Sequence, residues 1–320
     1  MTSHSHSSTR RRLIQGAAAV VALPARGAWA QAPARTLRIG NQKGNLSLLK
    51  GRGTLEKRLA PLGVAVKWTE FTAGPVQLEA LNVGSIDFGD VGEAPPIFAQ
   101  AAGAPLAYVA ATLPRPQSEA VIVPKGSAIQ SVKDLKGRKV ALNKGSNVHY
   151  FLVKLLEKHG LAYGDVSVVF LPPADARAAF EKGSIDAWVI WDPFLASAEK
   201  TLDAKVLADA TGVVGNRAYY FSSLDYAQKN ADVIKILIEE LDKVDQWAQA
   251  NLGAFATELS AIWGIPKPVV DVSVGRTKFG TGPITKAILG EQQKIADTFL
   301  ALGLIPKKIN LLDAAAAGIA

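Results

Sequence analysis

The feature that most constrains the fold is an internal repeat, because the chain carries the same pattern twice. The tetrapeptide Gly84-Ser85-Ile86-Asp87 recurs as Gly183-Ser184-Ile185-Asp186. In each copy the tetrapeptide follows three segments: a run of β-branched or aromatic residues, a loop with proline, and a helical segment. A second apolar run comes after the tetrapeptide. A further pair of similar segments, 38–45 and 139–146, lies upstream. The chain therefore contains two units of one architecture.

The order of elements in each unit predicts a parallel α/β sheet. Strands alternate with helices, polar loops that contain glycine or proline separate them, and a residue such as Gly84 supplies the left-handed conformation that ends a helix. Ligands of such sheets lie beyond the carboxyl ends of the strands, where the strand-to-helix loops gather. If two similar lobes face each other, all six of these loops can line one cleft that clamps a small ligand.

We therefore expect a two-lobed α/β protein whose lobes are joined by a two-strand hinge. Residues 120–123 have the pattern of a strand that crosses to the second lobe, and residues 218–222 that of a strand that returns. This assigns residues 31–121 and 222–320 to the first lobe and residues 122–221 to the second. From residue 225 onward, apolar residues at helical spacing have no counterpart in the repeat, and we expect these helices to pack against the first lobe.

The first thirty residues resemble an export signal. The twin arginines of Arg10-Arg11-Arg12 precede a short apolar stretch, residues 16–23, and Ala28-Trp29-Ala30 fits a cleavage site with small residues. The apolar stretch is much shorter than the roughly 20 residues of a membrane span. We predict a twin-arginine signal over residues 1–30, cleavage near Ala30 and a location in the periplasm.

The composition argues against several classes of function. Half of the net charge of +8 lies in the export signal, and the remaining basic residues are interspersed with acidic ones, so no basic face for nucleic acid is predicted. The chain has no cysteine, which excludes thiol catalysis and thiolate metal sites. Beyond the signal, His149 and His159 are too few for a metal cluster. We expect no metal, no cofactor and no catalytic residue.

Three loops have the chemistry of an oxyanion site. A loop rich in glycine and hydroxyl groups that enters a helix offers unpaired N–H groups and the positive end of the helix dipole. Glycine also lets a ligand approach the backbone. Each loop taken alone could be an ordinary helix cap. The candidates in these loops are Gln42, Lys43, Gly44, Thr72, Ala73, Gly74, Gly145, Ser146 and Asn147.

Positive side chains near the loops could add charge to this site. Lys43 and Lys144 occupy matching places, although lysines that flank a helix are usually solvated. Arg177 is the better candidate, because it lies in the first turn of a helix that begins near residue 173 and its guanidinium fork matches an oxyanion. The alternative for Arg177 is an ion pair within its lobe, with Asp175 or Asp186.

Glu93 and Asp192 occupy equivalent places next to Gly92 and Trp191. A carboxylate about 4 Å from a bound anion costs roughly 4 kcal/mol at an effective dielectric constant near 20. These side chains must therefore pair with Lys43, Lys144 or Arg177, receive the amine of a zwitterionic ligand, or cap their own loops. Paired carboxylates also occur in glycosidases, but no further catalytic group accompanies them here.

Aromatic residues next to the loops could form an apolar wall for a carbon tail. The candidates are Trp191, Phe71, Tyr150 and Phe221, and each of them could instead belong to a core. His149 could donate a hydrogen bond to the ligand from its place beside Ser146.

In these segments the chain resembles the periplasmic aliphatic sulfonate-binding proteins of ATP-binding-cassette (ABC) importers, within the broader taurine, nitrate and sulfonate group. The matching segments are 42–45, 70–71, 73–75, 78–86, 95–103, 173–180, 186–188 and 190–193. The resemblance implies a type II periplasmic binding protein fold and capture of an alkanesulfonate by hinge closure. It also implies delivery to an ABC permease in the inner membrane for sulfur acquisition. We expect a monomer that binds without turnover.

Two alternatives stay open within this resemblance or beside it. The same fold could bind taurine, nitrate or a sulfate ester, or the protein could be a periplasmic sensor subunit. A third alternative, an enzyme like the similar desulfinases, lacks support because those enzymes use a cysteine nucleophile, which this chain lacks.

Overall fold

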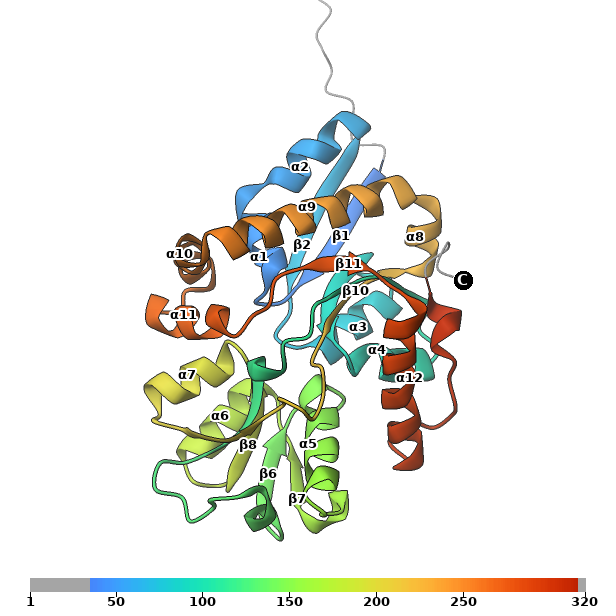
Figure 1. Ribbon diagram of the computed structural model, residues 1–320. Helices are drawn as coiled ribbons and strands as arrows, with labels where there is room; N and C mark the ends of the chain where they lie inside the picture. The colour runs from blue at the N-terminus through green and yellow to red at the C-terminus, as the bar shows by residue number, and fades with distance from the viewer. Residues whose placement is uncertain (1–34, 316–320) are drawn as a thin grey trace, which may run out of the picture. The chain divides into compact units, whose positions relative to one another are not determined.

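The computed structural model describes residues 35–315, and these residues form one compact unit. The predicted export signal and its cleavage site lie outside the described residues. Two open sheets organise the described part of the chain, and helices cover the faces of both (Figure 1).

The first sheet has six strands in the order β11-β4-β10-β3-β1-β2. Strand β1 pairs in parallel with β2 and β3, whereas β10 runs antiparallel between β3 and β4, and β11 is antiparallel to β4. The strands are β1 (Arg35–Asn41), β2 (Val64–Glu70), β3 (Phe88–Gly92), β4 (Leu106–Thr112), β10 (Ala218–Ser223) and β11 (Thr281–Pro283).

The second sheet has five strands in the order β7-β6-β8-β5-β9. Strand β6 is parallel to β7 and β8, and β5 is antiparallel to β8 and β9. The order corresponds to that of the first sheet without β11. The strands are β5 (Glu119–Val123), β6 (Lys139–Leu142), β7 (Ser167–Phe170), β8 (Ala187–Trp191) and β9 (Lys205–Asp209).

Two details of the predicted architecture need correction. The sheets are mixed rather than parallel, because each contains an inserted antiparallel strand, β10 in the first and β5 in the second. These strands were expected to cross between the lobes, but each is paired on both sides within one sheet. The chain passes from one sheet to the other in the irregular segments 113–118 and 210–217. Residues 120–123 are fully buried, which suits a central strand better than a hinge.

Helices cover both faces of each sheet. They are α1 (Asn45–Arg52), α2 (Thr54–Leu59), α3 (Gly74–Asn82), α4 (Pro95–Ala101), α5 (Asn147–Lys158), α6 (Pro173–Glu181), α7 (Phe194–Thr201), α8 (Leu224–Lys229), α9 (Ala231–Ala250), α10 (Leu252–Trp263), α11 (Lys267–Gly275) and α12 (Lys286–Ala301). Short 3-10 turns span Ala60–Leu62, Pro116–Ser118, Val132–Leu135, Tyr163–Asp165 and Leu311–Ala314.

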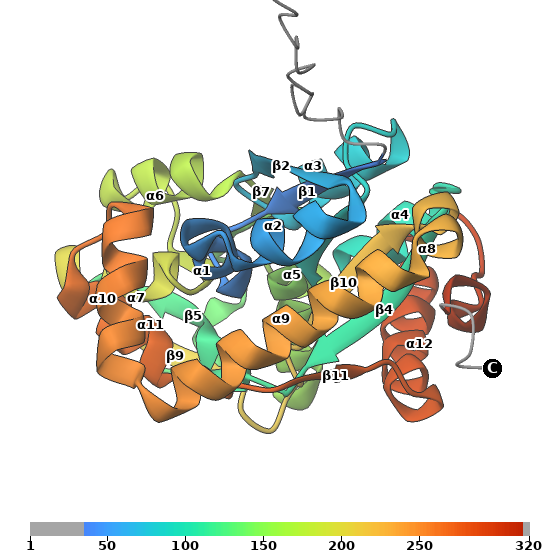
Figure 2. The same cartoon turned by 90° about the horizontal axis from the view of Figure 1, so that it is seen from above.

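The first sheet separates two cores. On one face, α9 runs alongside the sheet (Figure 2), and its Val233, Leu237 and Leu241 share a core with residues of β1 and β3. On the other face, α3, α4 and α12 surround Tyr108 and Phe221. In the second sheet, α5 covers one face, and α6 and α7 cover the other. Packing on both faces explains why the strands read as nearly continuous apolar runs.

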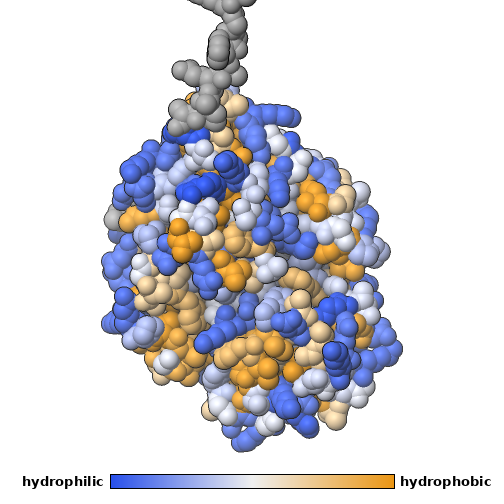
Figure 3. Space-filling model, turned by 180° about the vertical axis from the view of Figure 1, so that it is seen from behind, coloured by the Kyte–Doolittle hydropathy of each residue, from blue (hydrophilic) through white to orange (hydrophobic). Residues whose placement is uncertain are grey.

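The large apolar side chains are mostly enclosed in these cores. Figure 3 shows one face of the molecule, where hydrophilic residues separate smaller hydrophobic areas. None of the helices within residues 35–315 is both long enough and apolar enough to cross a membrane.

Candidate functional site

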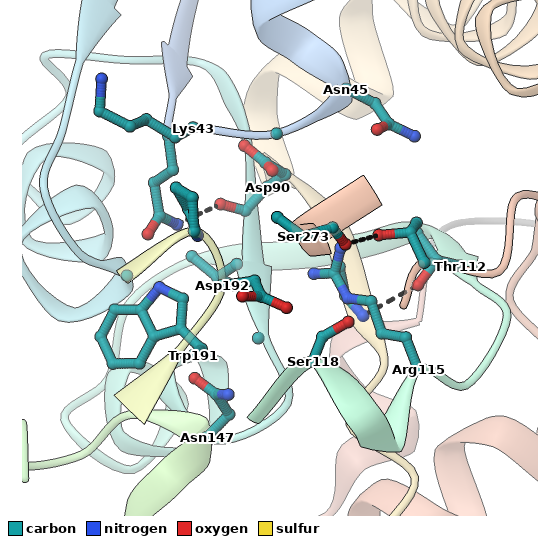
Figure 4. A pocket seen from close by; sticks show the side chains of 18 of the residues that line it. Lys43, Asn45, Asp90, Thr112, Arg115, Ser118, Asn147, Trp191, Asp192 and Ser273 are labelled. Carbon is teal, nitrogen blue, oxygen red and sulfur yellow. Dashed lines mark hydrogen bonds between the residues drawn. The ribbon is translucent and has the colours of Figure 1, made fainter. Parts of the chain in front are cut away.

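A cavity of about 240 Å³ lies where loops of the two sheets meet. The loops that enter α1, α3 and α4 line it from the first sheet, and those that enter α5 and α7 line it from the second (Figure 4). Of the six loops predicted to meet, the loop that enters α6 is not in the lining. It follows β7, which is the edge strand of the second sheet.

Most of the predicted binding residues are brought together at this cavity. Those that line it are Gln42, Lys43, Gly44, Thr72, Gly74, Gly92, Ser146, Asn147, Trp191 and Asp192. They come from five loops of two sheets, so the fold assembles a single site from distant parts of the sequence.

Four predicted residues lie elsewhere. Arg177 forms an ion pair with Glu181, at 2.8 Å, on its own helix, so its partner is neither Asp175 nor Asp186. Glu93 is buried behind the cavity, where one oxygen accepts a hydrogen bond from the backbone N–H of Arg217 at 3.4 Å. Ala73 is the buried residue that precedes α3, and Gly145 lines a second cavity, together with Lys144.

Backbone groups at helix N-termini face the cavity. Helix α1 begins after Gly44, α3 begins at Gly74, and α5 begins after Ser146. The Ser146 hydroxyl donates to the carbonyl of Asn143 at 2.7 Å, so it shapes its loop rather than capping α5. The first turns of these helices leave N–H groups that favour a negative ligand.

Arg115 is the main basic residue that the sequence analysis missed. It lies in the crossing segment 113–118 and is half-buried in the cavity wall. No carboxylate lies within 4.0 Å of its guanidinium among the residues that the structure describes. Lys43 is less available, because its Nζ donates to the carbonyl of Trp263 at 3.1 Å and lies 3.8 Å from Glu70. A crossing segment must pass the cleft, and this was the signal that could have pointed to Arg115.

Asp192 is held by groups of the protein. One oxygen accepts the backbone N–H of Ala196 at 3.0 Å, which caps α7, and Arg276 approaches to 3.4 Å. Burial raises the pKa of Asp192 to about 6, although the charge of Arg276 opposes this shift. Of the alternatives open for Asp192, capping is realised, whereas its basic partner is Arg276 and not Lys43, Lys144 or Arg177.

Asp90 is a second carboxylate in the lining, and the sequence analysis missed it. It lies on β3 opposite Tyr220 of β10, beneath the loop that contains Gly44. Its Oδ1 atom is buried and accepts no hydrogen bond from the described residues. Burial raises the pKa of Asp90 to about 6, and the charge of Arg115 opposes the shift.

An apolar wall faces these polar groups. Trp191 and Phe71 belong to it, as predicted, whereas Tyr150 and Phe221 are buried in a core. Other apolar residues of the lining include Tyr220 and residues from α7, α10 and α11, namely Phe194, Phe255, Leu259, Trp263 and Val274. The sequence analysis assigned α10 and α11 to packing alone and so missed their contribution.

Two further predictions concern histidine and metals. His149 is fully buried outside the cavity, where its Nδ1 accepts the N–H of Gly145 and its Nε2 lies 2.7 Å from the Tyr163 hydroxyl. Burial lowers the pKa of His149 to about 4.

Within residues 35–315, no group of three or more residues has the arrangement of a metal site.

Comparisons with known proteins identify the family of this chain. Residues 61–251 match the NMT1/THI5-like family. A relative from Escherichia coli (strain K12), whose name describes an aliphatic sulfonates-binding protein, is 39% identical over 88% of this chain and 89% of its own length. The taurine-binding periplasmic protein of the same organism is 28% identical over 78% of this chain and 81% of its own length.

A solved structure shows the same fold. The alkanesulfonate-binding protein from Xanthomonas axonopodis pv. citri, bound to MOPS, superposes with a TM-score of 0.83 at 38% identity, over 88% of this chain and 97% of that chain. This match confirms the predicted periplasmic binding protein fold. The chain therefore belongs to the NMT1/THI5-like family, and within it to the aliphatic sulfonate-binding proteins.

Proposed function

We propose that this protein captures alkanesulfonates in the periplasm and delivers them to an ABC permease, without chemical turnover. The observation that carries the proposal is the cavity. In it, an arginine that makes no ion pair with residues 35–315 and several helix N-termini face an aromatic wall. The ligand that suits these walls has a permanent anion at one end and an apolar tail at the other.

The polar part of the cavity suits a sulfonate headgroup. Arg115 makes no ion pair with the described residues, and its planar fork can donate two hydrogen bonds to neighbouring sulfonate oxygens. The N-termini of α1, α3 and α5 supply backbone donors for the remaining oxygens. A sulfonate stays charged at neutral pH, so these donors are matched by a full negative charge.

The aromatic wall suits a carbon tail. Trp191 and Phe194 from one side, with Phe255 and Trp263 from the other, offer apolar surface close to the anion site. Each buried methylene group contributes about 0.8 kcal/mol. Nitrate has no tail and would leave this wall uncovered. The names of the relatives and the MOPS bound to the Xanthomonas protein support the same class of ligand.

Capture would proceed by closure of two lobes, formed by each sheet with its helices. The irregular segments 113–118 and 210–217 support a hinge, because they alone carry the chain between the sheets within the described residues. Contacts that form only when both lobes touch the ligand would drive the closure. We further propose that the mature protein is a monomer and that the twin-arginine signal directs its export.

Isothermal titration calorimetry with methane-1-sulfonate, butane-1-sulfonate, nitrate and sulfate tests the proposal. We expect butane-1-sulfonate to bind at least about tenfold more tightly than methane-1-sulfonate, because its longer tail buries more apolar surface. Arg115→Ala should weaken binding of both sulfonates, whereas the exposed control Arg138→Ala should not. Binding of nitrate in preference to the sulfonates, or no binding of any sulfonate, would overturn the proposal.

A further inference from the structure

The charged residues of the cavity fall into two groups. Lys43 lies near Glu70, and Asp192 lies near Arg276, so these four charges have partners within the protein. Arg115 and Asp90 differ, since neither forms an ion pair within 4.0 Å among the described residues. Figure 4 shows both side chains reaching into the cavity from different sides. The cavity therefore has one unpaired positive and one unpaired negative residue.

The unpaired carboxylate of Asp90 conflicts with a purely apolar tail. Asp90 is half-buried, and its Oδ1 atom accepts no hydrogen bond from residues 35–315. When a sulfonate fills the cavity, water leaves the carboxylate, and two negative charges lie in one enclosed space. Removing an ionised group from water without a partner is costly, and like charges add repulsion. A cationic group on the ligand would remove both costs.

The other carboxylates near the cavity are less suited to receive a cation. Asp192 already accepts from the backbone of Ala196 and lies next to Arg276. Glu70 lies near Lys43 and has a side chain that is 56% exposed. Glu93, the other residue considered for an amine from sequence, does not line the cavity. Asp90 is thus the acceptor that remains.

We propose that the preferred ligands of this site are zwitterions, sulfonates whose tail carries an ammonium group that Asp90 receives while Arg115 binds the sulfonate. The inference rests on the proposed function, because it concerns the tail of the same ligand. It makes Asp90 a residue that determines specificity. Alkanesulfonates without an amine would still bind, through the headgroup and the aromatic wall.

A matched pair of ligands tests this assignment. 3-Aminopropane-1-sulfonate and butane-1-sulfonate have the same number of heavy atoms and differ in that an ammonium group replaces a methyl group. We would titrate both by calorimetry near neutral pH into the wild-type protein, Asp90→Asn and the exposed control Asp175→Asn. Asn keeps the size of the side chain and removes its charge, and thermal melting of each variant without ligand checks that it folds.

The wild-type protein should bind the aminosulfonate about tenfold more tightly, since a hydrogen bond to a charged group is worth about 1.5 kcal/mol or more. Asp90→Asn should abolish this preference, and Asp175→Asn should keep it as the wild type does. The inference is overturned if the wild-type protein prefers butane-1-sulfonate, or if Asp90→Asn weakens both ligands equally. If neither ligand binds, the proposed function itself fails, which is a distinguishable result.

Discussion

At the scale of single residues, the contact between Gly92 and Asn147 joins the two sides of the cavity. Gly92 ends β3 of the first sheet, and Asn147 begins α5 beside the second sheet. A Cβ atom placed on Gly92 would lie 2.9 Å from Cβ and 3.0 Å from Oδ1 of Asn147. These distances are shorter than van der Waals contact, so only glycine permits the observed approach.

We predict that Gly92→Ala weakens sulfonate binding about tenfold, because the added methyl group keeps the two sides apart in the closed form. The unfolding temperature of the protein without ligand should change little, since an open form relieves the clash. Calorimetry and thermal melting measure the two effects.

Gly290→Ala is the matched control for this substitution. Gly290 lies in α12, and a Cβ atom there would meet no other atom within 4 Å. Binding should stay at the wild-type level in this variant. Unchanged affinity in Gly92→Ala would show that the contact with Asn147 is not needed for binding.

The cationic residue of the site could not be assigned from local sequence. Arg177 has the position and the chemistry expected of an anion ligand, but its helix follows the edge strand β7 and lies outside the cavity. Arg115 has no glycine-rich neighbour, and only the topology of the crossing segments brings it into the cleft. The glycine-containing loops were predictable because their role depends on residues adjacent in the chain.

At the scale of elements, a buried acidic pair lies where β3, β5 and α5 meet. Glu119 is fully buried at the start of β5, and Glu93 follows β3. The Asn147 side chain donates a hydrogen bond to Glu119, and one oxygen of each glutamate has no hydrogen-bond partner among the described residues. Arg115, Arg217 and Glu291 are the other charged groups near the pair.

This pair gives the stability of the fold a definite dependence on pH. Burial raises the pKa of Glu93 to about 7, and burial and the charge of Glu93 raise the pKa of Glu119. The pKa of each glutamate is higher in the folded protein than in the unfolded chain. At a pH between these two pKa values, the folded protein therefore binds more protons than the unfolded chain does. The free energy of unfolding must then fall as pH rises through this interval.

We predict that the free energy of unfolding in urea decreases between acidic pH and neutral pH. The contribution of Glu93 is at most about 3 kcal/mol, since one pKa unit corresponds to about 1.4 kcal/mol. Asp90 and Asp192, whose pKa values are raised to about 6, act in the same direction. Glu93→Gln should flatten the dependence, whereas the exposed control Glu79→Gln should keep it. A stability that rises over this interval would contradict the assignment.

The repeat of elements was predictable because the aspartate of the repeated tetrapeptide makes the same hydrogen bond to the backbone in both copies. Asp87 accepts the backbone N–H of Arg38 at 2.9 Å, and Asp186 accepts that of Lys139 at 2.7 Å. Each aspartate thus ties the segment before β3 or β8 to the neighbouring strand. The antiparallel strands β10 and β5 could not be placed from the repeat, because each is inserted from a distant part of the chain.

At the scale of the whole molecule, Arg276 connects the C-terminal helices to the second sheet. It follows α11, which shares a core with the first sheet. Its guanidinium lies 2.6 Å from Glu199 of α7 and 3.4 Å from Asp192. The three side chains are mostly buried, so this ion-pair cluster stabilises the form in which the two sides of the cavity meet.

We predict that Arg276→Ala weakens binding of butane-1-sulfonate about tenfold or more, because Asp192 is left buried without its basic partner. Calorimetry measures this loss. Arg58→Ala is the control, since Arg58 pairs with Glu239 and Glu240 of α9, away from the cavity. Equal affinities of Arg276→Ala and the wild type would show that the cluster does not support the closed form.

The central claim is that the two lobes close around a sulfonate, and the distance between them tests it most directly. Because the chain has no cysteine, Lys67→Cys on β2 and Lys182→Cys next to α6 allow one fluorophore to be attached to each lobe. Energy transfer between the fluorophores should increase on addition of butane-1-sulfonate, with the same midpoint as the calorimetric titration, and should not respond to nitrate. An unchanged energy transfer at a saturating sulfonate concentration would contradict the claim.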